Sequence, residues 1–222
     1  IEADGVHRVP LVADKRNTSG GREGGAILIP AEHGVIMPFR YAEVFRAPFP
    51  VNGDTVRMVA VNYPIDMSES SFACDDANLV KVYDLCKHSI LATSFAGLYV
   101  DGDRERIPYE ADALVNQLSH YTTDREYTTA RRSIAHLIEH PTWPTEWILI
   151  TPRMAWLDYL YTADRRMLER HYTDLAAKTL VPLRDERGLI STRTGLVSDS
   201  VKRSVHFRGH TLRDIVDWPQ SG

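Results

Sequence analysis

The chain has 222 residues, of which 43% are hydrophobic and 25% are charged, as in most folded globular proteins. Its formal net charge of −4 excludes the basic excess that is typical of general nucleic-acid binding. No apolar run approaches the roughly 18 residues of a membrane-spanning helix, so we expect neither a nucleic acid nor a membrane as a partner.

Residues 1–66 have the pattern of antiparallel β structure. The segments GGAILIP (24–30), GVIMPFRYAEVF (34–45) and DTVRMVAVNYPI (54–65) are rich in β-branched and aromatic residues. Stretches rich in Gly, Pro and Asn separate these segments, as turns separate strands. The region is too short and too irregular to form a complete domain.

A helical period begins at Asp75. The first predicted helix has Asp75 or Asp76 as its N-cap and stops at Gly97. Its apolar positions recur every three or four residues, and its predicted inward residues are Leu79, Val82, Cys86, Ile90 and Thr93. On one helix, Cys74 and Cys86 would lie about 18 Å apart, which is too far for a disulfide. We therefore expect two free thiols, both mostly buried.

Two more helices are predicted between Pro108 and Pro141. The second runs from Pro108–Glu110 to about Tyr121. The third begins with a capping box, in which Thr123 is the N-cap and Glu126 follows three residues later, and it ends at Pro141. Their predicted inward residues are Leu114, Leu118, Tyr127, Ala130, Ile134, Leu137 and Ile138.

The fourth and fifth predicted helices form a similar pair. The fourth begins at Thr151–Pro152, because proline suits the first turn of a helix, and Asp164 caps the fifth, which runs to about Leu183. Their predicted inward residues are Met154, Leu157, Tyr161, Leu168, Tyr172, Leu175 and Thr179. Short links favour antiparallel neighbours, so we predict a stack of helical hairpins.

One candidate site is HLIEH (136–140), which matches the H-x-x-E-H pattern of some zinc peptidases. His136 and His140 would share a helix face, and Glu139 would act as the base. The motif abuts Pro141, and no downstream segment offers a clear third ligand. The alternative is a partly exposed last turn, where histidines interact favourably with the helix dipole.

A second candidate site is DGDRERIPYEAD (101–112), which places five carboxylates and two arginines between two helices. One interpretation is a solvated loop with salt bridges. The other is a cavity lined by acids, since glycoside hydrolysis needs one protonated and one ionised carboxyl group. Asp101, Asp103 and Asp112 would favour a protonated Glu105, because like charges at close range disfavour ionisation. Arg104 and Arg106 would oppose this if they pointed at the same site.

The same residues resemble a known family. FACDDANLVKVYDLC (72–86) followed by YVDGDRERIPYEADALVNQ (99–117) resembles the catalytic-domain entry of bacterial α-L-rhamnosidases, glycoside hydrolase family 78. TEWILITPRMAWLDYLYTADRRML (145–168) and RDIVDWP (213–219) resemble later segments of that family. The resemblance implies a mainly α fold. Residues 67–222 would form the first part of an (α/α)6 barrel, and residues 1–66 would be the tail of a β-sandwich and a linker.

The resemblance also implies a reaction, the inverting hydrolysis of a terminal α-L-rhamnosyl bond without a cofactor or metal. Glu105 corresponds to the general acid of the family, and the substrate would be a rhamnose-containing carbohydrate. The implied substrate-binding residues are Asp101, Arg104, Tyr109, Asp112, Trp147, Asp217 and Trp218. Among these, Asp101 and Asp112 would hold sugar hydroxyls, and the aromatic side chains would form walls of the pocket.

The chain does not contain every part that the family resemblance implies. The family's general base is a glutamate that would lie beyond Gly222, and twelve barrel helices do not fit in this length. We therefore expect a C-terminal half, either as a separate chain or as missing sequence, and a periplasmic or extracellular location by resemblance. Two alternatives remain open: a non-catalytic carbohydrate-binding relic, and a zinc hydrolase that uses His136, Glu139 and His140.

Overall fold

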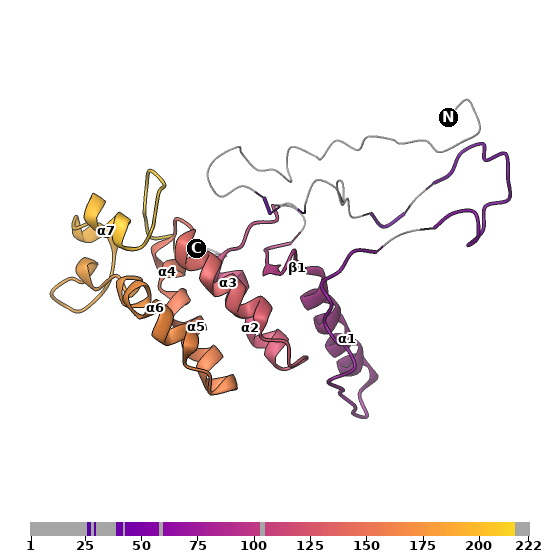
Figure 1. The fold of residues 1–222 in the computed structure, drawn as a ribbon, viewed down its shortest axis with the longest axis horizontal. Coiled ribbons are helices and arrows are strands. Elements are labelled where there is room, and N and C mark those ends of the chain that lie inside the picture. The colour runs from indigo at the N-terminus through magenta and orange to yellow at the C-terminus, as the bar shows by residue number, and fades with distance from the viewer. Residues whose placement is uncertain are drawn as a thin grey trace.

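The structure is a computed structural model that describes residues 26–27, 29, 39–41, 43–57, 60–102 and 105–215. Helices dominate this part of the chain (Figure 1). They are α1 (Ala77–Ala92), α2 (Glu110–Tyr121), α3 (Thr128–Glu139), α4 (Thr145–Ile148), α5 (Ile150–Thr162), α6 (Arg166–Ala177) and α7 (Asp199–Ser204), with the 3-10 turns η3 (Val181–Leu183) and η4 (Thr192–Thr194). The short strands β1 (Ser94–Phe95) and β2 (Leu98–Tyr99) pair antiparallel between α1 and α2.

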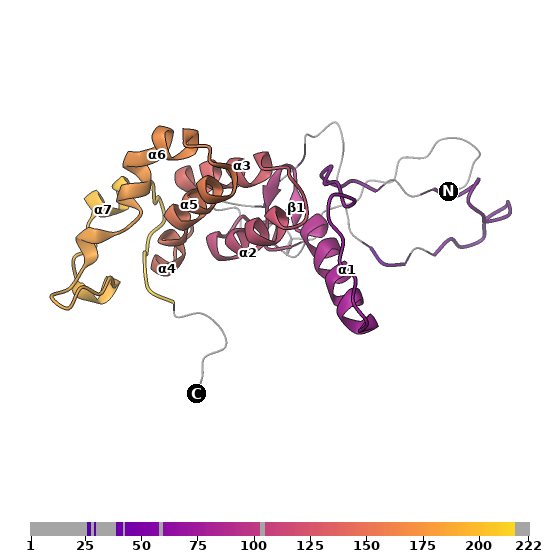
Figure 2. The same cartoon turned by 90° about the horizontal axis from the view of Figure 1, so that it is seen from below.

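The helices stand in a row, with α1 at one end and α7 at the other (Figures 1 and 2). Helices α2 and α3 form one hairpin, and α5 and α6 form the next, with α5 packed against α2, α3 and α6. This arrangement confirms the prediction of a mainly helical chain built from hairpins. The first core cluster joins them and consists of Tyr99, Ala113, Tyr121, Ala130, Ile134, Leu137, Ile138, Met154, Ala155 and Leu175.

A second core cluster lies at the α7 end of the row. Its buried residues are Ile148, Leu180, Leu183, Val201, Val205, Phe207 and Leu212. It connects α4 to the turns after α6 and to α7, so residues 178–215 are folded against the helices although their sequence shows little periodicity. The buried residues of both clusters are the apolar surface that stabilises the row of helices.

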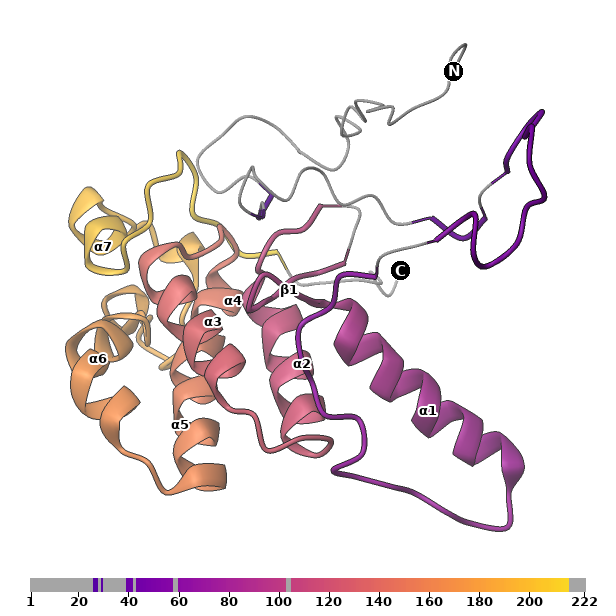
Figure 3. The same ribbon diagram turned by 45° about the vertical axis from the view of Figure 1, so that its right-hand side comes forward.

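The β structure predicted for residues 1–66 is not found where this region is described. Residues 39–41, 43–57 and 60–66 contain no strand, and Val51, Val56 and Val61 are exposed. Residues 43–57 extend to the side of α1, away from the other helices (Figures 1 and 3). A β-branched segment becomes a strand only when it pairs, and the described residues of this region have no strand partner. The rest of residues 1–66 lies outside the described residues.

The starts of α1 and α2 agree with the sequence, and the start of α3 does not. The Asp76 carboxylate accepts a hydrogen bond from the Asn78 N–H, as an N-cap should. The predicted capping box of Thr123 and Glu126 is wrong. Glu126 lies before α3 and accepts from the N–H groups of Thr128 and Thr129, while the Thr123 hydroxyl donates to carbonyls at the end of α2.

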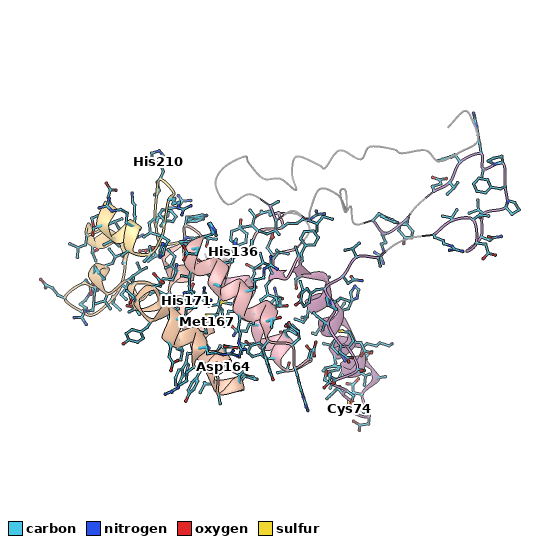
Figure 4. All side chains as sticks on the ribbon, viewed as in Figure 1. Cys74, His136, Asp164, Met167, His171 and His210 are labelled. Atoms are coloured by element: carbon cyan, nitrogen blue, oxygen red, sulfur yellow. The ribbon has the colours of Figure 1, made fainter. Side chains whose placement is uncertain are left out.

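Several predicted inward positions are exposed. Leu79 and Val82 are 53% and 54% exposed, because α1 is the end helix of the row and packs against α2 and β1. Tyr161 on α5 and Tyr172 on α6 are also exposed. Both cysteines are free, as predicted, but they are exposed rather than buried, and Cys74 lies before the start of α1 (Figure 4).

No helix in the described ranges combines the length and apolar character that crossing a bilayer requires.

Candidate active site

The segment that follows β2 forms a closed loop before α2. The Asp101 N–H donates to the Ile107 carbonyl over 3.0 Å, and the Ile107 N–H donates to Asp101 Oδ1 over 3.1 Å. Between them, the Arg106 N–H donates to the Gly102 carbonyl. An aspartate that accepts a nearby N–H commonly closes such a turn. Asp101 therefore has a structural role in addition to the sugar-binding role expected from the sequence.

Arg106 is buried, with 7% of its surface exposed, and is therefore not a solvated side chain. Its backbone is left-handed, with φ of 56°, a conformation that side chains with a Cβ rarely adopt. The guanidinium lies 5.0 Å from the centre of the Phe95 ring, and the Arg106 carbonyl accepts from the Ile27 N–H over 2.9 Å. These contacts turn Arg106 toward β1, which leaves the solvated-loop interpretation wrong for this residue.

Three of the sequence-predicted residues meet at the start of α2. The Tyr109 hydroxyl donates to Glu105 Oε2 over 2.6 Å. The Tyr109 ring packs edge-on against Trp147 of α4, with ring centres 5.3 Å apart and an interplanar angle of 73°. All three side chains are half-buried. A carboxyl group with a hydroxyl donor beside two aromatic rings is a combination suited to a ligand with polar edges and an apolar face.

Asp112 lies one turn into α2, where it is half-buried. An acid in the first turn is favoured by the helix dipole, so its position has a local explanation besides a role in binding. Arg104, Asp217 and Trp218, the remaining sequence-predicted residues, lie outside the described residues, as does Asp103.

Glu110 is the residue that sequence reasoning left unassigned and that the structure makes central. It is fully buried, and its carboxyl oxygens accept from the Thr142 N–H over 3.0 Å and from the Thr142 hydroxyl. Burial raises the pKa of the Glu110 carboxyl, and the Thr142 hydrogen bonds and nearby Lys178 oppose that rise. Glu110 thereby fastens the start of α2 to the loop that leads into α4. In a sequence, an acid at the start of a helix indicates only a favourable interaction with the helix dipole. No sequence pattern could therefore have predicted that Glu110 is buried.

Lys178 is a buried cation whose charge lowers the pKa of Glu110. Its ammonium donates to the Val205 carbonyl over 3.2 Å. Burial lowers the pKa of Lys178 to about 8, and the negative charge of Glu110 partly offsets that effect. The Glu110 carboxyl therefore lies in an environment that contains both hydrogen-bond donors and a positive charge.

The last described segment runs beside α4. The Ile215 N–H donates to both carboxyl oxygens of Glu146 at 3.1 Å, and the Thr145 N–H donates to the Arg213 carbonyl over 3.0 Å. The Arg213 guanidinium lies 4.5 Å from the centre of the Trp143 ring. Helix α4, which carries Trp147, is therefore held on one side by residues of the RDIVDWP segment.

The HLIEH motif forms the last turn of α3 (Figure 4). The rings of His136 and His140 lie 4.8 Å apart. Burial, together with nearby His140 and Arg132, lowers the pKa of His136 to about 4. Glu139 points toward His206, with 3.8 Å between Oε2 and Nδ1. Within the described part of the chain, no three His, Cys, Asp or Glu side chains are grouped as metal ligands, so the zinc interpretation lacks a third ligand there.

A carboxyl group beside aromatic rings on a row of helical hairpins is compatible with a glycoside hydrolase, because that chemistry uses carboxyl groups. The family model described as bacterial alpha-L-rhamnosidase 6 hairpin glycosidase domain matches residues 67–197. Because that match covers more than half of the 222 residues, the chain belongs to this family and is an α-L-rhamnosidase-like glycoside hydrolase. Comparisons with curated proteins and with solved structures gave no match.

Proposed function

We propose that this chain carries the general acid and part of the sugar pocket of an enzyme that removes terminal α-L-rhamnose with inversion. The observation that carries the proposal is the hydrogen bond from Tyr109 to Glu105, 2.6 Å long, beside the Tyr109–Trp147 ring pair. It joins the residue that resembles the family's acid to two aromatic side chains suited to a sugar face.

In an inverting mechanism, a protonated carboxyl group gives its proton to the departing glycosidic oxygen. Glu105 takes this role in our proposal. A second, ionised carboxylate removes a proton from water as that water attacks the opposite face of the sugar. Tyr109 donates to Oε2 of Glu105, and this hydrogen bond supports the proposal because it would orient the carboxyl group for proton transfer.

The remaining pocket residues hold the sugar. Asp101 and Asp112 accept hydrogen bonds from rhamnose hydroxyls, and Tyr109 and Trp147 pack against the face of the ring. The other proposed substrate-binding residues are Arg104, Asp217 and Trp218. The proposed substrate is therefore a glycan or glycoside that ends in rhamnose, and by family resemblance the enzyme acts in the periplasm or outside the cell.

The general base is proposed to lie outside this chain, in a C-terminal half that completes an (α/α)6 barrel. Exposed apolar side chains on α1 support further polypeptide at that end of the row, since Leu79, Val82 and Leu85 are each more than half exposed. Contiguous apolar side chains on a surface commonly mark a contact with protein.

The test measures p-nitrophenol release from p-nitrophenyl α-L-rhamnoside by the natural polypeptide that contains this chain. We expect Glu105→Gln to lower kcat by about 100- to 10,000-fold, the usual contribution of a general acid. Exposed Glu186 provides the control variant, Glu186→Gln. Robust turnover by residues 1–222 alone would contradict the assignment of the base to other sequence. Rhamnose binding without turnover by the natural polypeptide would instead indicate a non-catalytic carbohydrate-binding protein.

A further inference from the structure

A cavity of about 310 Å³ lies between α7 and the loop that follows it, at the end of the row opposite α1. This volume is at the lower end of the range found for small-molecule sites. Figure 4 shows His210 on that loop, above α7. The side chains that line the cavity are mostly basic: Lys202, Arg203, Arg208 and His210, together with Phe207 and Asp199.

The cavity has a fixed wall. Phe207 belongs to the second core cluster and is 8% exposed. The loop passes so close to this ring that a Cβ atom on Gly209 would lie 2.6 Å from Phe207 Cζ, so only glycine fits there. The Lys202 ammonium donates to the His210 carbonyl over 3.1 Å, which ties the loop to α7.

The side chains that line the cavity carry a net positive charge, although the whole chain is negative. Lys202, Arg203 and Arg208 face a single carboxylate, that of Asp199, so the lining carries a net charge of about +2 with neutral His210. Asp199 lies 3.8 Å from the Lys202 ammonium, and its side chain is 82% exposed. The whole chain has a formal net charge of −4, so the positive cavity is a local feature.

We propose that this cavity binds a small ligand through a carboxylate, sulfate or phosphate group. Guanidinium groups present paired N–H donors that match the oxygens of such anions. The two arginines supply these donors, and Lys202 adds a point charge fixed by its bond to the loop. The lining residues begin at Asp199, beyond the family match at residues 67–197, and the proposal does not depend on the rhamnosidase assignment.

The experiment titrates the 222-residue chain with D-glucuronate, inorganic phosphate and D-glucose, and follows binding by calorimetry and by chemical shifts of backbone amides. We expect saturable binding of at least one of the two anions and none of glucose. Binding should weaken at least 10-fold in Arg203→Gln/Arg208→Gln. The control Arg165→Gln/Arg170→Gln removes the same charge from exposed arginines of the α6 region and should leave the affinity unchanged.

Each outcome decides part of the proposal. Tighter binding of glucuronate than of phosphate would identify a sugar acid as the ligand, and the reverse would identify a free or esterified phosphate. The proposal is overturned if neither anion binds saturably, or if the two double variants lose affinity equally. Thermal melting of both variants, whose substituted residues are exposed, checks that a loss of affinity does not reflect unfolding.

Discussion

At the scale of single residues, substitution can separate the hydroxyl contact of Tyr109 from the contact that its ring makes. Its hydroxyl donates to Glu105, and its ring packs against Trp147. Tyr109→Phe removes the first contact and keeps the second, so we expect kcat to fall by up to about 10-fold, the worth of one hydrogen bond to a neutral carboxyl group, with KM nearly unchanged. Steady-state kinetics of the natural polypeptide on the p-nitrophenyl rhamnoside measure both constants. An unchanged kcat would show that the hydroxyl does not position Glu105.

Glu110 leads to a prediction about stability. Glu110→Ala leaves the half-buried Thr142 donors without their acceptor and removes the carboxyl group near Lys178. We expect the free energy of unfolding to fall by about 1–3 kcal/mol, the cost of unsatisfied buried polar groups. Glu110→Gln keeps an acceptor and should lose less. Urea unfolding of the 222-residue chain measures these differences, with exposed Glu186→Ala as the control. Equal stability of Glu110→Ala and wild type would contradict the fastening role.

The site shows what a sequence can and cannot reveal about single residues. The family resemblance named Glu105, Tyr109 and Trp147, and the structure brings these three side chains together, while their roles in binding and catalysis stay predictions. The hydrogen bond between Glu105 and Tyr109 could not be predicted. It spans a non-helical turn that depends on the left-handed backbone of Arg106, and no sequence pattern marks that conformation in a residue other than glycine.

At the scale of elements, α3 supports a prediction about pH. Burial lowers the pKa of His136 to about 4, whereas a histidine in the unfolded chain has a pKa near 6.5. Between these values the unfolded state binds more protons than the folded state, so stability decreases as the pH falls from about 6.5 toward 4. We expect His136→Gln to reduce the loss of stability between pH 7 and pH 5.

Urea unfolding of wild type and His136→Gln at pH 7 and pH 5 measures this effect. The comparison of one substitution isolates His136 from Glu110, whose raised pKa acts in the opposite direction. Burial also lowers the pKa of His120, so His136→Gln should retain part of the pH dependence. An identical pH dependence in wild type and variant would show that His136 titrates like an exposed histidine.

Helix positions were easier to predict than helix surroundings. The starts of α1 and α2 followed from an N-cap aspartate and from the residues after Pro108, because these signals are local. The exposure of Leu79 and Tyr172 could not be predicted from the sequence. An apolar stripe shows that one face of a helix can be buried, but it does not show whether another element covers that face. The absence of strands in the described part of residues 1–66 has the same cause, since a strand depends on a partner distant in sequence.

At the scale of the whole molecule, the row of hairpins presents the start of α2 and α4 to each other and fixes the site between them. Glu110 joins α2 to the loop before α4, and Ile215 joins the last described segment to Glu146 of α4. The family assignment required the combined pattern of residues 67–197, because the acids of the loop alone also fit a solvated turn.

The measurement that tests the central claim most directly compares leaving groups in the natural polypeptide and its Glu105→Gln variant. A general acid matters most when the leaving oxygen is basic and needs a proton. We therefore expect Glu105→Gln to lower kcat/KM by about 100-fold or more for phenyl α-L-rhamnoside, and far less for the 2,4-dinitrophenyl derivative, whose leaving group departs without protonation. Equal losses for both substrates, or no loss for either, would contradict the assignment of Glu105 as the general acid.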